Sequence, residues 1–280
     1  MDALTFLKKT EKELQKKGIS SPRIELEILL SHILGIERYK IYIEKIFLSE
    51  KIQKKLLKLI EERKKRIPTA YLTKKIYFYD CEFIIEKGVF IPRPETELLV
   101  EKTINLYKEY FYPKKVKILD IGTGCGNIAI TLAKNIDNCL VTGIDFSKKS
   151  LKIAHRNVFL NNVEKKVNLL FSNIFSEIKE KFEIIVSNPP YVSENEYKKL
   201  EKEITKEPKR ALIGGKDGLK IIEKILKGSL YHLKKNGFLI IEIGYNQAPK
   251  IRKFVPPELK LFSIEKDFSS FERIMVFKKI

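Results

Sequence analysis

Tryptophan is absent from this 280-residue chain, and glycine (13) and cysteine (3) are scarce. The cysteine count is odd, and no CxxC pair or matching histidine spacing indicates a disulfide framework or a zinc site. We therefore expect Cys81, Cys125 and Cys139 to be free thiols, and we expect no metal. No apolar stretch approaches the ~20 residues that span a bilayer, and residues 1–10 do not resemble a signal peptide. These absences predict a cytoplasmic protein that does not enter a membrane.

Positive charge is in marked excess, since 55 Lys and Arg residues face 36 Asp and Glu residues, a net charge of +19. One explanation is a nucleic-acid or ribosomal partner. The other is a codon bias towards adenine and thymine, which would favour Lys, Ile and Asn at the expense of Gly and Trp. The lysines are spread along the chain rather than gathered in one block, which favours the second explanation. We therefore expect no requirement for direct nucleic-acid binding, and a monomer is the default expectation.

Three segments differ in character, and they set the expected domains at residues 1–72, 73–92 and 93–280. Apolar residues recur at helical spacing in the first segment, with Ser21 and Ser49 as expected N-caps, Gly35 after one helix and Pro68 after another. This pattern predicts a small helical bundle. The second segment is rich in aromatic and β-branched residues, and we expect a β-hairpin there with its turn at Lys87-Gly88.

Strands and helices alternate in the third segment, which predicts an α/β fold with a mostly parallel seven-stranded sheet covered on both faces. Helical stretches are expected between the first five strands. The last two strands follow each other closely, so one of them is open to an antiparallel direction. The expected strands are Val116–Ile121, Leu140–Asp145, Val167–Phe171, Phe182–Ser187, Phe238–Ile243, Leu259–Ile264 and Arg273–Phe277.

A glycine-rich loop follows the first of these strands, with the sequence Gly122-Thr123-Gly124-Cys125-Gly126. In a doubly wound sheet this turn holds a nucleotide-like ligand. The spacing is G-x-G-x-G rather than G-x-G-x-x-G, which disfavours a pyrophosphate and favours a flatter, less anionic ligand. Asp145 ends the next strand about twenty residues later, where its carboxylate would accept hydrogen bonds from two ribose hydroxyls. The loop and Asp145 together predict a nucleoside cofactor.

The most specific signal is Asn188-Pro189-Pro190-Tyr191, directly after the fourth strand. An amide or other planar nitrogen is a weak nucleophile because its lone pair is delocalised, so its N–H groups must be held while the nitrogen turns towards a methyl group. The Asn188 side-chain oxygen and the Pro189 carbonyl oxygen are suited to accept those two N–H groups. Prolines stiffen the turn, and Tyr191 offers a flat surface for packing. We expect Asn188, Pro189 and Tyr191 to be the catalytic residues, with no general base required.

The chain resembles the release-factor glutamine N5-methyltransferase family over nearly its whole length. The resemblance rests on the glycine loop, on Asn188-Pro189-Pro190-Tyr191, and on the runs Ser21-Pro22-Arg23, Pro68-Thr69-Ala70-Tyr71-Leu72, Ile91-Pro92-Arg93-Pro94-Glu95-Thr96-Glu97 and Glu207-Pro208. It implies a Rossmann-like class I methyltransferase domain that uses S-adenosyl-L-methionine. It also implies a bacterial-type release factor as substrate, methylated at the glutamine of its Gly-Gly-Gln loop in support of translation termination, and a helical domain that recognises this substrate.

Site residues carried over by the resemblance fall into two groups. The cofactor is expected to contact Gly122, Thr123, Gly124, Cys125, Gly126, Asp145, Asn173, Ile174 and Asn188. The substrate glutamine is expected to contact Asn188, Pro189, Pro190 and Tyr191. Asn173 is a departure, because relatives often carry Asp there. Its neutral amide would bind the adenine amino group more weakly than a carboxylate, and Ile174 would cover the adenine face with less area than an aromatic residue.

Two substrate classes compete with the release factor. The Asn-Pro-Pro-Tyr motif is shared with adenine-N6 methyltransferases that act on nucleic acids, although this chain has no recognisable DNA-reading module or base-flipping machinery. A glutamine in a ribosomal protein would use the same chemistry. A non-enzymatic ribosome-associated binder is a further alternative, which the intact Asn188 and Asp145 disfavour. The N-terminal helical segment separates these possibilities by resemblance alone.

Overall fold

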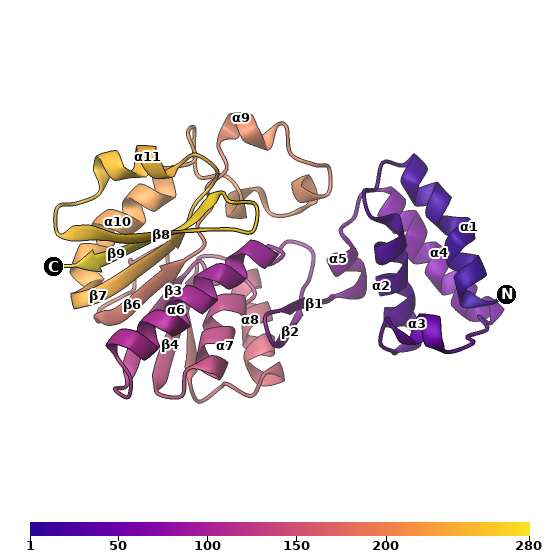
Figure 1. Cartoon of the computed structure of the whole chain (residues 1–280), viewed down its shortest axis with the longest axis horizontal. Helices are drawn as coiled ribbons and strands as arrows, with labels where there is room; N and C mark the ends of the chain where they lie inside the picture. Colours follow the sequence, from indigo (N-terminus) through magenta and orange to yellow (C-terminus); the bar gives the residue numbers. More distant parts are fainter. The chain divides into compact units, whose positions relative to one another are not determined.

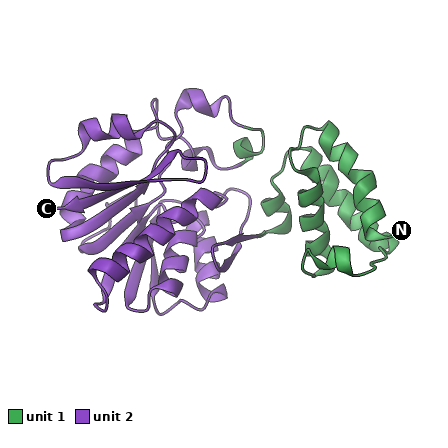
Figure 2. Ribbon diagram, viewed as in Figure 1, with its two compact units in different colours: residues 1–75, 201–206 green, residues 76–200, 207–280 purple.

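The computed structural model describes all 280 residues and divides into two compact units (Figure 2). Unit 1 comprises residues 1–75 together with 201–206, and unit 2 comprises residues 76–200 and 207–280. Unit 1 thus contains a short segment that the sequence places deep within the second half of the chain. Neither unit contains a helix with the length and apolarity needed to cross a membrane.

Unit 1 is a helical bundle around a single apolar core (Figure 1). The Ser49 hydroxyl caps α4 by accepting the N–H of Ile52, and Gly35 ends α2 in the left-handed conformation, both as predicted. Ser21 precedes α2 as expected, but its side chain makes no capping bond. The helices are α1 Ala3–Lys16, α2 Pro22–Leu34, α3 Lys40–Ile43, α4 Glu50–Lys64 and α5 Thr69–Thr73.

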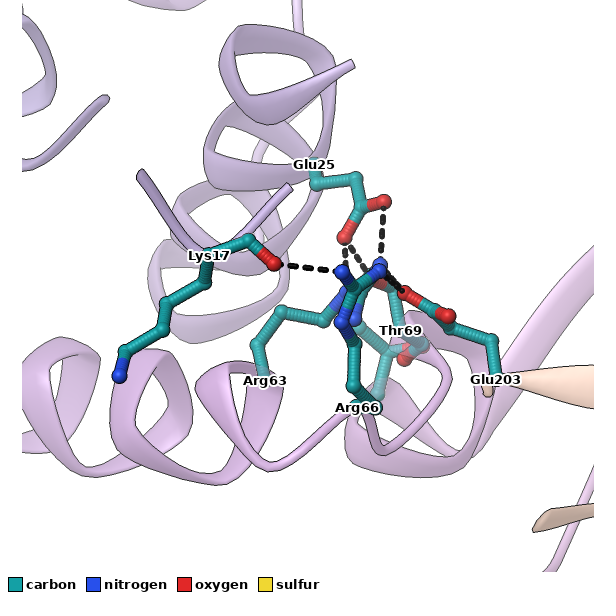
Figure 3. Close-up of polar contacts among 7 residues, drawn as sticks. Lys17, Glu25, Arg63, Arg66, Thr69 and Glu203 are labelled. Carbon is teal, nitrogen blue, oxygen red and sulfur yellow. Dashed lines mark hydrogen bonds and ion pairs between the residues drawn. The ribbon is translucent and has the colours of Figure 1, made fainter. Parts of the chain in front are cut away.

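A partly buried ionic cluster joins the 201–206 segment to the helices of unit 1 (Figure 3). Arg63 donates to Glu25 through two nitrogens and to Glu203 Oε1 at 2.9 Å. Arg66 donates to the same Glu203 oxygen at 2.7 Å, and the Thr69 hydroxyl donates to Glu25 at 2.8 Å. Burial would raise the pKa of Glu203, but hydrogen bonds from Arg66 and Arg63 hold it below its usual value. Two guanidinium groups therefore face two carboxylates, and the local charge is balanced.

The hairpin of unit 2 turns earlier than the sequence predicts. Its strands β1 Lys75–Phe78 and β2 Cys81–Ile84 are joined at Tyr79 and Asp80, and Tyr79 adopts φ 56°. Gly88 does lie in a turn, but the residues after it form no strand, so the predicted turn position was wrong. The hairpin packs on helix α8 (Lys148–Leu160), whose Asn157 exchanges two hydrogen bonds with the Ile84 backbone.

A seven-stranded sheet forms the centre of unit 2, as predicted (Figure 1), and its strands lie in the order β5-β4-β3-β6-β7-β9-β8. Strands β3 to β7 run parallel to one another, and β9 is antiparallel to both β7 and β8. The strands are β3 Val116–Ile121, β4 Cys139–Asp145, β5 Val167–Phe171, β6 Phe182–Ser187, β7 Leu233–Glu242, β8 Leu259–Lys266 and β9 Glu272–Lys279. Every predicted strand is present, with ends that differ by up to five residues, the largest difference being the start of β7.

Helices cover both faces of this sheet (Figure 1). One face packs its apolar side chains against α10 and α11, and α6 and α7 pack on the sheet as well. No helix lies between β5 and β6, contrary to our prediction, because residues 172–181 form only turns tied by Ser172 side-chain bonds. The remaining helices of this unit are α6 Glu97–Tyr110, α7 Asn127–Asn135, α9 Glu194–Tyr197, α10 Lys220–His232 and α11 Ala248–Ile251, and the 3-10 turn η1 Pro94–Thr96 precedes α6.

The order in which the chain adds strands to the sheet changes direction after β5. From β3 it moves outward through β4 to β5, and it then returns to β6 on the other side of β3. Ligands of doubly wound sheets bind at the carboxyl ends of the strands at such a switch point. Ile121 pairs with Ser187 at the last rung of the β3–β6 ladder. The glycine loop and the Asn-Pro-Pro-Tyr turn therefore begin side by side.

We expect Glu203→Ala to lower the stability of the protein by about 1–3 kcal/mol, because Arg63 and Arg66 would lose their shared carboxylate in a partly buried cluster. Glu201→Ala is the matched control, since Glu201 is exposed on the same segment, and it should change stability by less than about 0.5 kcal/mol. Thermal and urea unfolding of both variants measure the difference. Equal stabilities of the two variants would show that the cluster contributes nothing.

Candidate active site

The glycine loop forms a tight turn with open space beside it. Gly122, Gly124 and Gly126 adopt φ 77°, 58° and 88°, in the left-handed region that favours glycine. The N–H groups of Gly122 and Thr123 donate to the Ile144 carbonyl at 2.9 and 2.8 Å, which fixes the loop to the end of β4. A Cβ atom at Gly122 would meet no protein atom within 4 Å. The loop is thus rigid, and a ligand can approach its backbone closely.

Asp145 lies beside this loop with both carboxylate oxygens partly engaged. Its Oδ2 accepts the Gly124 N–H at 3.0 Å, and its Oδ1 accepts the Ser147 N–H at 2.7 Å. Each oxygen retains capacity for another hydrogen bond, so the pair can hold two ligand hydroxyls. Burial raises the pKa of Asp145, while the bonds from Ser147 and Gly124 oppose that shift.

Asp120, in contrast, contacts the loop from the protein interior. It is fully buried, and its Oδ2 accepts the Thr123 hydroxyl at 2.6 Å. Burial raises the pKa of Asp120 to about 7. Its other oxygen has no hydrogen-bond partner in the protein. Asp120 is not on the wall of the cavity, so in this structure it holds the loop.

Asn173 and Ile174 follow β5 at the same edge of the sheet. The Asn173 side chain is exposed, and Ile174 has φ 56°, which is unusual for a β-branched residue. The Ser172 hydroxyl donates to the Ile174 carbonyl at 3.0 Å and holds this conformation. The turn therefore presents an amide and an apolar side chain to the cavity.

Phe146 and Arg210 line the same cavity and were not predicted. The Arg210 guanidinium lies 5.1 Å from the centre of the Phe146 ring and donates to the Ser147 hydroxyl at 3.2 Å. A cation over an aromatic face is attracted by the ring quadrupole. This contact connects the segment that contains Arg210 to the end of β4.

The turn after β6 is pressed against a second backbone segment. A Cβ atom at Gly218, which has φ 80°, would lie 2.1 Å from the Tyr191 carbonyl oxygen, and one at Gly214 would lie 2.3 Å from that of Pro190. Only glycine leaves room for these contacts. The Val192 N–H also donates to the Leu212 carbonyl at 2.9 Å. The Asn-Pro-Pro-Tyr turn is therefore held from behind as well as by its own prolines.

Tyr191 does not line the cavity. Its ring packs against the core of unit 2, and its hydroxyl donates to Glu242 Oε1 at 3.2 Å. Gln247 donates to the Tyr191 carbonyl at 2.8 Å. Burial raises the pKa of the Tyr191 phenol, with the neighbouring Glu242 charge acting in the same direction. In this structure the tyrosine therefore supports the site from within the fold.

Asn188 lines the cavity and is held by a buried polar chain. Its side-chain nitrogen donates to the Thr96 hydroxyl at 2.9 Å, and that hydroxyl donates to Glu242 Oε2 at 2.7 Å. Thr96 and Glu242 are each 1% exposed, so water does not compete for these bonds. Burial raises the pKa of Glu242 to about 7. The Asn188 side-chain oxygen is left to face other partners.

Glu207 fixes another part of the site. It is buried, and it accepts the Ile91 N–H at 3.0 Å and an N–H of the Arg93 guanidinium. Burial raises the pKa of Glu207, and the Arg93 charge opposes that shift. Pro208 and Arg210, just beyond it, line the cavity. Glu207 thus anchors one wall of the cavity to the segment that leads into η1.

These groups surround one cavity of about 330 Å³ within unit 2. Of the residues predicted to contact ligands, Gly126 and Tyr191 are not on its wall. Gly126 instead begins α7. The predicted residues on the wall are Gly122, Thr123, Gly124, Cys125, Asp145, Asn173, Ile174, Asn188, Pro189 and Pro190.

No group of three or more His, Cys, Asp or Glu side chains is placed to bind a metal ion. Burial raises the pKa of the Cys125 thiol to about 12, so it contributes an apolar surface and no thiolate.

The predictions missed Thr96, Glu242 and Arg210. Thr96 lies in a run that the resemblance included, but nothing near it in sequence indicates a contact with Asn188. Glu242 did carry a signal, because it is a lone carboxylate at the end of the apolar strand residues 238–241. Asp145 ends β4 in the same way. Arg210 lies in a Lys- and Glu-rich segment where one cation does not stand out.

Comparisons with known proteins agree with this architecture. The methyltransferase small domain model matches residues 82–218, and the PrmC N-terminal domain model matches residues 5–73. The release factor glutamine methyltransferase of Fusobacterium nucleatum subsp. nucleatum is 36% identical over 282 residues, which cover 99% of this chain and 78% of that protein. The release factor glutamine methyltransferase of Buchnera aphidicola subsp. Schizaphis graminum is 40% identical, with 96% of each chain covered. A solved methyltransferase structure from Pyrococcus furiosus shares the fold with a TM-score of 0.54 at 21% identity, covering 78% of this chain and 98% of that one.

Two glycine substitutions should distinguish a position with open space beside it from a position in close backbone contact. Gly122→Ala adds a methyl group in open space at a left-handed position, so we expect a stability loss of roughly 1–2 kcal/mol without ligand. Gly218→Ala adds the same strain and a backbone clash, and should lose more than about 3 kcal/mol. Urea unfolding of the ligand-free variants measures both. If Gly218→Ala were no less stable than Gly122→Ala, the turn would not be held as described.

Proposed function

Since this chain belongs to the release factor glutamine methyltransferase family, we propose that it methylates a glutamine side-chain amide nitrogen (N5) in a peptide-chain release factor. The methyl donor is S-adenosyl-L-methionine. Family membership indicates the substrate. The observation that carries the chemistry is Asn188, which lines the cavity beside the glycine loop with its amide nitrogen bound to Thr96.

The residues of the cavity fit S-adenosyl-L-methionine. When bound, this cofactor supplies an electrophilic methyl group. Asp145 has two carboxylate oxygens available for ribose hydroxyls, and the open backbone at Gly122 admits the methionine portion. Asn173 and Ile174 would meet the adenine, through the amide oxygen and the apolar side chain respectively. Asp120 is buried beneath the loop, so it would meet the methionine ammonium only through a bridging water.

The proposed substrate contacts come from the Asn-Pro-Pro-Tyr turn. The Asn188 side-chain oxygen and the Pro189 carbonyl oxygen would each accept one N–H of the glutamine amide. With both N–H groups held, the nitrogen is positioned to turn its lone pair towards the methyl group. The amide proton becomes acidic after transfer, so no strong base is needed. Pro190 lines the cavity next to this pair and would contact the glutamine side chain.

The finer features of the partner belong to the same proposal. The glutamine is that of the Gly-Gly-Gln loop of a bacterial-type release factor, and unit 1 contributes to holding this protein. The enzyme acts in the cytoplasm, where translation terminates, as a monomer and without direct nucleic-acid binding. The positive net charge of +19 favours encounter with an acidic protein surface.

Labelled S-adenosyl-L-methionine tests this assignment directly. We expect methyl transfer to a purified release factor and none to the same factor with its loop glutamine changed to alanine. Asn188→Ala should reduce transfer by about 100-fold or more, because one of the two aligned acceptors is lost. DNA, RNA and ribosomal proteins serve as competing substrates in parallel reactions. Label in any of these, and none in the release factor, would refute the proposed substrate.

Asn173→Asp should strengthen cofactor binding. A carboxylate would make a charge-assisted bond to the adenine amino group in place of a neutral one, and such bonds are roughly twice as strong. We expect the Kd for S-adenosyl-L-methionine to fall by about 3- to 10-fold, measured by isothermal titration calorimetry. Asn168→Asp, a substitution on exposed β5 surface, is the control for the added charge. An unchanged or higher Kd for Asn173→Asp would place the adenine elsewhere.

A further inference from the structure

We propose that Thr96 and Glu242 are positioning residues that orient the Asn188 amide, and that they aim its oxygen at the substrate only while Glu242 is ionised. This inference rests on the proposed function for its catalytic meaning. The geometry itself lies within unit 2 and involves no ligand. It assigns a role to two residues that are not on the wall of the cavity.

The direction of each hydrogen bond from Asn188 through Thr96 to Glu242 follows from the number of protons that each group can donate. An ionised carboxylate can only accept, and Glu242 accepts from Thr96 at Oε2 and from Tyr191 at Oε1. A hydroxyl has one proton, so a Thr96 hydroxyl that donates to Glu242 can only accept from Asn188. The group of Asn188 that faces Thr96 must then be its NH₂. The Asn188 oxygen is consequently directed away from Thr96, where it is available to an N–H donor.

Protonation of Glu242 removes this constraint. A carboxylic acid carries one O–H, which can donate to the Thr96 hydroxyl oxygen. The Thr96 proton is then released to donate to Asn188, and the favourable partner becomes the Asn188 oxygen. The amide would turn over and present its NH₂ group to the substrate N–H, two donors that repel each other. One proton on Glu242 therefore changes Asn188 from an acceptor to a donor at the reacting nitrogen.

The Thr96 hydroxyl does not serve a local structural role such as helix capping. It is the residue before α6, a position where threonine side chains commonly cap the helix, yet its side chain makes no capping bond. Both functions of its hydroxyl are used by Asn188 and Glu242, which lie 92 and 146 residues away in sequence. Its hydroxyl therefore connects distant parts of unit 2 instead of capping its own helix.

The surroundings of Glu242 hold its titration near neutrality. Burial favours the neutral acid, while the Thr96 bond, the Arg273 charge and the Tyr191 bond favour the carboxylate, and the charge of Glu95 opposes it. Arg273 on β9 is itself shared with Asp267 at 2.8 Å, which weakens its effect on Glu242. Burial is the largest of these effects, and the net result raises the pKa of Glu242 to about 7. The ionised form therefore gains population as the pH rises through 7.

Isosteric substitution at Thr96 tests the role in catalysis. Thr96→Val removes the hydroxyl at constant shape, and we expect kcat for release-factor methylation to fall about 10- to 100-fold, with the Kd for S-adenosyl-L-methionine changed less than twofold. Thr96→Ser keeps the hydroxyl and should retain kcat within about threefold. Thermal unfolding of both variants verifies that they are folded. Equal kcat for Thr96→Val and wild type, or an equal loss in Thr96→Ser, would overturn the inference.

The pH dependence supplies a readout that a structural role would not move. Wild-type kcat should rise with pH along a limb centred near 7, and Glu242→Gln should be slow at every pH and lack that limb. A wild-type profile without an acid limb between pH 5.5 and 8.5 would contradict the role of Glu242.

A second measurement needs no substrate. In protein labelled with ¹⁵N-asparagine, the side-chain NH₂ resonance of Asn188, assigned by its loss in Asn188→Ala, should shift with pH around 7 in wild type. It should not shift in Glu242→Gln. A wild-type resonance that ignores pH would overturn the inference. If the wild type does not methylate a release factor, the proposed function fails, and the resonance still decides the orientation of Asn188.

Discussion

The parallel pairing of β3 with β6 is the constraint on which the site depends. These strands are separated by more than sixty residues in sequence, yet Ile121 and Ser187 are opposite each other at the last rung. The Ser187 hydroxyl donates to the Ile121 carbonyl at 2.8 Å, which adds a side-chain bond where the ladder ends. The glycine loop and the Asn-Pro-Pro-Tyr turn therefore begin at the same level of the sheet. A one-residue slip would move every β6 side chain to the opposite face of the sheet. Because helices already pack on both faces, the core of unit 2 enforces this alignment.

The strands of unit 2 could be predicted from the sequence because each is a short apolar run bounded by turn residues. The connections were less predictable. Residues 172–181 are too few and too polar to form a helix after their turns are made, and alternation alone did not reveal this. The hairpin turned at Tyr79 rather than at Gly88 because the position of a turn depends on which strands pair, and Tyr79 tolerates φ 56° there.

The site was predictable where its residues are contiguous. The glycine loop, Asp145 and the Asn-Pro-Pro-Tyr turn each follow a recognisable strand, and the fold brings them to one edge. Thr96 and Glu242 could not be predicted in the same way, because their significance comes from contacts across 92 and 146 residues. Tyr191 had been expected to face the substrate, whereas its hydroxyl meets Glu242 within the fold. Periodicity and spacing describe neighbours along the chain, and buried polar networks connect distant ones.

The 201–206 segment has a consequence for how this protein can be divided or recombined. The chain passes from unit 1 to unit 2, returns to unit 1 for six residues, and passes to unit 2 again. The helical bundle is therefore a discontinuous module. A gene fragment that ends at residue 75 would encode helices without the carboxylate that Arg63 and Arg66 share, and the remainder would carry that carboxylate without its cations. Exchange of N-terminal domains between relatives, in evolution or in the laboratory, would have to exchange both segments together.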